Sequence, residues 1–199
     1  MSRSRVTRVI QLTFAQMGLK RGKRACVALL QESSELPGAA WKSHSPITTR
    51  SGALGGHDAI AKRARKQRRA AAWKDFAQLH SSRKVKIKVW PLASFADAES
   101  RVASFYRVMR EQLQENDKTV EVPLGPDYDS NRCDQAQGFA YMFDPGKGKN
   151  QTFRILISRV DETIFSVSCS SDGDGWTWDE VFAIASLQRA RILTSREKS

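Results

Sequence analysis

The 199-residue sequence has few of the residues that define several common protein classes. It contains 3 cysteines and 3 histidines, and no two of them have the close spacing of a zinc site. The wide spacing of the cysteines also excludes a small domain built on disulfides. No apolar run approaches the roughly 18 residues that a membrane-spanning helix requires, so the sequence predicts no transmembrane segment.

Positive charge, by contrast, is in excess, and it is unevenly distributed. Lys and Arg total 33 against 21 Asp and Glu, which gives a net charge of +12. Residues 1–88 hold 20 basic and 4 acidic residues, a net of +16, whereas residues 89–199 hold 13 and 17, a net of −4. This asymmetry predicts a polyanionic partner for the first half, such as a nucleic acid or an anionic membrane. Attraction between the two halves and docking onto an acidic protein are the alternatives.

The amino terminus is basic but lacks the pattern of an exported protein. Three arginines precede a moderately apolar stretch over residues 9–19, and four cations follow where a signal peptide would have its cleavage site. We therefore expect a cytoplasmic protein with free cysteine thiols. We expect residues 1–24 to form a basic extension, and residues 25–199 to form a single α+β domain that includes a basic segment at 57–80.

The second half of the chain predicts a sheet with two helices. Lysines and β-branched residues alternate perfectly over residues 84–89, which indicates a half-buried strand. Capping-box patterns and apolar residues at helical spacing predict helices over 94–115 and 177–192. The fold class is therefore α+β, a mainly antiparallel sheet of about five or six strands with two amphipathic helices packed on it. Further strands, joined by connections too short for a crossover helix, are expected at 119–124, 137–143, 152–159 and 163–169.

The first half gives weaker structural signals. Residues 24–33 suggest a short helix, and Trp41 with Ile47–Thr49 suggests a strand. Strong helix formers occupy residues 59–79, so we expect a helix there, although its apolar residues gather only at the end.

No group of reactive residues predicts an enzyme. Cys169 is in phase with Phe165 and Val167 along an expected strand, so its thiol should be buried and inert. Paired carboxylates lie in expected loops or at a helix start, where acidic residues are common. The sequence Lys147-Gly148-Lys149 lacks the glycine spacing and the strand-to-helix context of a phosphate-binding loop. We therefore predict no catalytic residue, metal or cofactor, and the sequence favours a non-enzymatic role.

Two groups of cations are the candidate binding residues. On a helix, the cations of residues 62–69 would cover most of the circumference and contact phosphates with little sequence preference. The lysines of the 84–89 strand would extend that surface. The alternatives are a solvated surface, an edge strand protected against aggregation, and an anionic membrane; no aromatic residues interleave with these cations, as they do in RNA-binding sheets. The candidates are Lys62, Arg63, Arg65, Lys66, Arg68, Arg69, Lys84, Lys86 and Lys88.

Three short motifs carry a resemblance to a known group of domains. They are Leu36-Pro37-Gly38-Ala39-Ala40-Trp41, the segment 93–98 and the segment 159–167. These resemble the opening, the strand-to-helix junction and the last hairpin of actinobacterial sensor-type and lipoprotein domains with a PsbP-like α/β sandwich. The resemblance covers residues 27–193. It implies an antiparallel sheet with packed helices and a binding or sensing role, without a shared catalytic residue.

Two functions are expected from these observations. The first is a non-enzymatic binding or accessory protein that acts on an unidentified partner through protein–protein or ligand contacts. The second is a nucleic-acid-binding accessory protein that uses residues 62–69 and the strand lysines. Titration with generic DNA and RNA at two salt concentrations distinguishes them, because phosphate contacts are weakened by salt.

Overall fold

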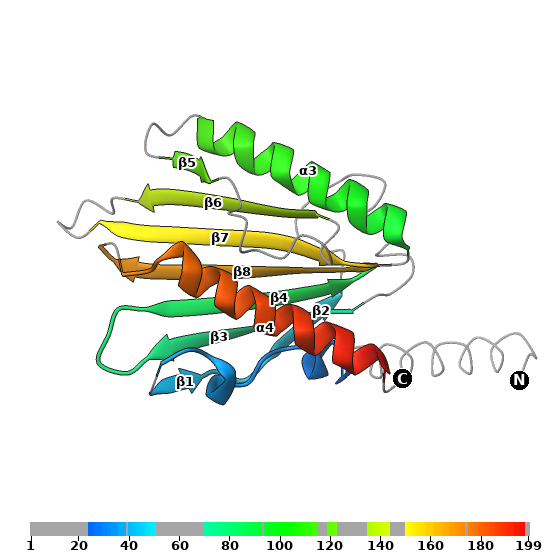
Figure 1. Cartoon of the computed structure of the whole chain (residues 1–199), viewed down its shortest axis with the longest axis horizontal. Helices are drawn as coiled ribbons and strands as arrows, with labels where there is room; N and C mark the ends of the chain where they lie inside the picture. Colours follow the sequence, from blue (N-terminus) through cyan, green and yellow to red (C-terminus); the bar gives the residue numbers. More distant parts are fainter. Residues whose placement is uncertain are drawn as a thin grey trace, which may run out of the picture.

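The computed structural model shows one antiparallel sheet with a long helix on each face (Figure 1). It describes residues 24–38, 40–50, 70–92, 94–114, 119–122, 135–143, 150–173 and 175–197. The strands are β1 (Trp41–Ser43), β2 (Ile47–Arg50), β3 (Ala70–Gln78), β4 (Lys84–Pro91), β5 (Thr119–Val122), β6 (Gln135–Phe143), β7 (Gln151–Val160) and β8 (Thr163–Asp172). The helices are the 3₁₀ turn η1 (Ser33–Glu35), α3 (Phe95–Gln114) and α4 (Trp178–Glu197).

The strands pair in the order β1-β3-β4-β8-β7-β6-β5, and β2 also pairs with β3. Every pair is antiparallel. The predicted α+β class is therefore confirmed, although the described residues form eight strands of the sheet where the sequence predicts about five or six. The difference comes from β3, which the sequence predicts to be helical, and from two short strands, β1 and β2, where it predicts one.

The helix predicted over residues 59–79 is wrong in its described part, because Ala70–Gln78 form β3. Ala70, Ala71 and Ala72 have high helix propensity, yet all three are buried within the sheet. Ala71 packs in the core on one face of the sheet, and Ala70 and Ala72 pack in the core on the other. Contacts on both faces outweigh the propensity of the residue types. Residues 1–23 of the expected basic extension 1–24 and the cations at 62–69 lie outside the described residues.

The larger core lies between the sheet and α4, which crosses the strands in Figure 1. Val85, Ile87 and Val89 of β4 are all buried in this core, which confirms the alternation read from the sequence. The predicted capping box at the start of α4 is also present. The Glu180 backbone N–H donates to Thr177 Oγ1 at 3.3 Å, and the Thr177 backbone N–H donates to Glu180 Oε2 at 2.9 Å.

Helix α3 covers part of the opposite face, mainly over β6, β7 and β8. Its residues Ala98 and Val102 are buried in a second core with Phe139 of β6. The helix begins after Ser94, whose hydroxyl accepts a hydrogen bond from the Asp97 backbone N–H at 3.2 Å. None of the helices in the described part of the chain is long and apolar enough to cross a membrane.

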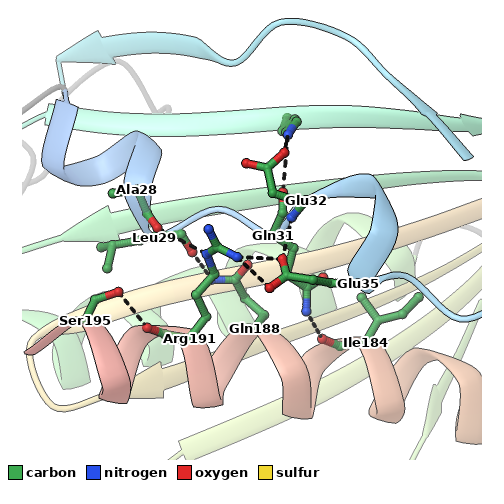
Figure 2. Close-up of polar contacts among 10 residues, drawn as sticks. Ala28, Leu29, Gln31, Glu32, Glu35, Ile184, Gln188, Arg191 and Ser195 are labelled. Atoms are coloured by element: carbon green, nitrogen blue, oxygen red, sulfur yellow. Dashed lines mark hydrogen bonds and ion pairs between the residues drawn. The ribbon is translucent and has the colours of Figure 1, made fainter.

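Two buried glutamines attach the segment before β1 to α4 (Figure 2). This segment is helical at residues 24–28 and continues into η1, so the helix predicted at 24–33 is shorter than expected. The Gln31 side-chain amide donates to the Ile184 carbonyl at 2.9 Å, while the Gln188 amide donates to the Leu29 carbonyl at 2.6 Å. In one bond a side chain of the segment reaches the α4 backbone, and in the other a side chain of α4 reaches the backbone of the segment.

Charged residues add to this attachment (Figure 2). The Arg191 guanidinium on α4 binds both carboxylate oxygens of Glu35 at 2.6 Å. Lys74 of β3, the described lysine of the basic segment 57–80, pairs with Glu32. The Lys74 side chain is 5% exposed, so it faces the α4 core and does not add to a basic surface.

Candidate nucleic-acid interface

The lysines of β4 form a row on the sheet face opposite α4. Because side chains alternate along a strand, Lys84, Lys86 and Lys88 point away from the core that holds the intervening residues. Lys84 is exposed, whereas Lys86 and Lys88 are partly buried. The predicted lysine row of β4 is thus present and lies on one face.

A row of serines lies beside these lysines on β8. Ser170, Ser168 and Ser166 are the register partners of Lys84, Lys86 and Lys88, in that order. Directly opposite residues share a face of the sheet, so each lysine stands next to a short hydroxyl side chain. We call these six residues the lysine–serine face.

On the other side of the lysine row lies β3, which contributes one negative charge. Asp75 is the register partner of Lys86, and its carboxylate lies 3.1 Å from the Lys86 ammonium. Both side chains are partly exposed, Asp75 at 35% and Lys86 at 43%, so this pair is weak and open to competition. Lys84 and Lys88 form no ion pair with any residue that the structure describes.

A fourth lysine reaches the same face from β1. Lys42 is the register partner of Ala77, and Ala77 is in turn the partner of Lys84. Lys42 is exposed. Each β4 lysine and its register partners on the neighbouring strands form one row across the sheet. Between β1 and β8 the three rows hold four lysines and one carboxylate. Asp172 lies beyond the last row, at the end of β8.

Aromatic side chains border the serine row on its far side. Phe153 of β7 is the register partner of Ser170, and Tyr141 of β6 is the partner of Phe153. The two rings stack with centroids 4.7 Å apart and an interplanar angle of 4°. Burial raises the pKa of the Tyr141 hydroxyl, so this ring stays neutral at physiological pH.

The pKa of Lys88 indicates that its ammonium group has too little negative charge beside it. Burial and the neighbouring Lys86 charge lower the pKa of Lys88, and Asp75 opposes them only in part. A lowered lysine pKa means that the protonated amine has less stabilisation than it would have in water. An anion placed beside Lys88 would supply that stabilisation.

The structure brings together only part of the predicted site. Lys84, Lys86 and Lys88 lie on one face, but the cations predicted to join them, residues 62–69, lie outside the described residues. The sequence prediction missed the serine row and the aromatic pair. The serines alternate with apolar residues along 163–170, so a signal was present, whereas the aromatic pair becomes adjacent to the lysines only through strand register.

The predicted burial of Cys169 is confirmed. Cys169 is buried beside the α4 core, and burial raises the pKa of its thiol far above the usual range. Cys26 is also a buried free thiol, and its Sγ donates to the Ala70 carbonyl at 3.3 Å. Within the described ranges, no cluster of three or more His, Cys, Asp or Glu side chains is arranged to hold a metal ion.

Comparison with known proteins places the fold but not the function. No protein-family model matches the chain, and no curated protein matches it. The chain is similar to the extracellular domain of PknH from Mycobacterium tuberculosis, with 12% identity and a TM-score of 0.56 over 86% of this chain and 96% of that one. A structure from Bacteroides thetaiotaomicron, at 17% identity, covers 57% of this chain and 36% of that one with a TM-score of 0.34, too low to carry an argument. The chain thus shares its overall fold with that domain.

Proposed function

We propose that this protein is a non-enzymatic binding protein whose working surface is the lysine–serine face, and that its partner is a nucleic acid. The observation that carries the proposal is the charge of that face and its neighbours, because with Lys42 and Asp75 the three rows hold four lysines and one carboxylate. Such a face repels itself unless anions neutralise it. The proposal narrows the broader expectation of an accessory protein acting through protein or ligand contacts.

The spacing of the lysines supports a polymer of phosphates as the anion. Alternate residues of a strand are about 6.8 Å apart, a distance similar to that between neighbouring phosphates along a nucleic-acid strand. Lys84 and Lys86 can therefore each meet a different phosphate of one strand. Each such contact releases counterions, so affinity should fall steeply with salt.

A cytoplasmic location belongs to the same proposal. The buried free thiols of Cys26 and Cys169 suit a reducing compartment.

The sheet with a helix on each face also supports a PsbP-like α/β sandwich as the finer description of the fold.

The test compares one lysine of the face with a cation on the opposite side of the sheet. Binding of a fluorescently labelled oligonucleotide is measured by anisotropy at several salt concentrations for Lys84→Gln and for Arg24→Gln. Arg24 is exposed and belongs to the segment that packs on the α4 side. Lys84→Gln should reduce the salt slope by about 0.7 and the affinity at 0.1 M salt by about fivefold, and Arg24→Gln should change neither.

Two outcomes would overturn the proposal. Absence of saturable binding at low salt would remove the nucleic acid as partner and favour a protein partner. Equal losses for the two variants would show that binding follows total charge and not this face.

A further inference from the structure

The stacked pair of Phe153 and Tyr141 leaves one aromatic surface turned toward the serines. The rings are parallel, with centroids 4.7 Å apart, so each ring has one face against its partner and one outer face. The strands follow the order β8-β7-β6, and Tyr141 lies on β6. The outer face of Phe153 is therefore directed toward β8, where its register partner is the short side chain of Ser170.

Lys84 and Phe153 lie on either side of Ser170. Lys84 is the partner of Ser170 on β4, and Phe153 is its partner on β7. Two strand spacings separate Lys84 from Phe153, about 10 Å between their backbones. Ser170 fills little of the height above the sheet, so a flat group can lie against the ring while an attached anion reaches the ammonium.

The second row repeats this arrangement with an aliphatic neighbour. Lys86, Ser168 and Ile155 lie side by side on β4, β8 and β7. Ile155 packs against the second core and is only partly buried, so the exposed part of its side chain offers further apolar surface next to Phe153. A ligand that suits both rows must therefore carry anions along one edge and flat apolar groups along the other.

We infer that the lysine–serine face binds single-stranded nucleic acid, with phosphates at Lys84 and Lys86 and a base stacked on the outer face of Phe153. This inference rests on the proposed function and specifies its ligand. In a duplex the bases stack on one another and their faces are not available to a protein ring, whereas the bases of a single strand are. Serine hydroxyls both donate and accept hydrogen bonds, so Ser168 and Ser170 suit any base and the binding should tolerate changes of sequence.

The experiment measures affinity for a single-stranded decamer of thymidine and for a hairpin duplex with the same number of phosphates. Phe153→Leu should weaken single-strand binding about tenfold and leave duplex binding and the salt slope unchanged. Phe153→Tyr keeps the ring and should bind as the wild type does. The matched control is Phe182→Leu, which breaks a stacked pair with Trp178 on α4, on the other side of the sheet. Circular dichroism and the thermal unfolding midpoint verify that each variant is folded.

The outcomes separate this inference from the proposed function. Equal affinity for the two ligands, or an unchanged single-strand affinity in Phe153→Leu, overturns the inference. The proposed function still holds in that case if binding depends on salt and on Lys84. If Phe153→Leu is unfolded, the inference is tested by Phe153→Tyr and by the ratio of single-strand to duplex affinity of the wild-type protein. A ratio near one overturns the inference. Absence of binding to either ligand overturns both.

Discussion

Lys74 is a buried cation whose anionic partner is mostly exposed, and this asymmetry gives a sharp prediction about stability. The Lys74 side chain is 5% exposed and that of Glu32 is 58% exposed. The Lys74 ammonium donates to the Glu32 carboxylate and, at 3.4 Å, to the Gln31 carbonyl, and it lies 5.4 Å from the centre of the Phe76 ring. The two partners should therefore respond very differently to substitution.

Lys74→Met removes the group that is costly to bury. Transfer of an ammonium from water costs several kcal/mol, and Glu32 keeps its hydration when the lysine is gone. The exposed member limits the attraction of the pair to about 1 kcal/mol. We expect the free energy of unfolding to stay within about 1 kcal/mol of the wild-type value or to rise.

Glu32→Ala has the opposite effect, because it leaves the ammonium buried without its anion. We expect it to lower the free energy of unfolding by about 1 kcal/mol, which is the attraction that the exposed carboxylate provides. Urea denaturation followed by tryptophan fluorescence measures both variants. The double variant should resemble Lys74→Met, since the anion is not needed once the cation is gone. A larger loss in Lys74→Met than in Glu32→Ala would refute the reasoning.

Three further predictions concern a helix cap, a thiol and a lysine. Thr177→Ala should lower the free energy of unfolding in urea by about 1 kcal/mol, because it removes the cap of α4, and Thr177→Ser should restore most of it. Burial raises the pKa of Cys169, so a thiol reagent followed by mass spectrometry should modify it only after denaturation; equal rates in both states would contradict this. Burial and Lys86 lower the pKa of Lys88, so oligonucleotide affinity measured by anisotropy should fall as the pH rises toward that pKa, and Lys88→Gln should flatten the fall.

Elements whose signals are local were predictable from the sequence. Val85, Ile87 and Val89 alternate with lysines, and the capping residues Ser94 and Thr177 mark where α3 and α4 begin. Each of these signals depends on neighbours within a few positions along the chain. The strand β3 was not predictable in this way, because its alanines favour a helix until β4 and the β1–β2 edge pack beside them.

The candidate interface was also predictable only in part. The lysine row follows from the period of a single strand, and the sequence predicts it correctly. The aromatic border does not, because Phe153 and Tyr141 come from strands far from Lys84 in the chain and are related to it through two and three register pairs, respectively. The two aromatic residues do not lie among the candidate cations along the chain, although the folded sheet places Phe153 two strands and Tyr141 three strands from Lys84.

Footprinting of lysines tests the central claim most directly. The protein is treated with an acetylating reagent at low salt, with and without a saturating single-stranded oligonucleotide, and the modification of each lysine is measured by mass spectrometry. The account predicts that Lys84 and Lys86 are protected by the oligonucleotide and that high salt abolishes the protection. Unchanged modification of Lys84 and Lys86, with protection confined to Lys62 and Lys66, would contradict it.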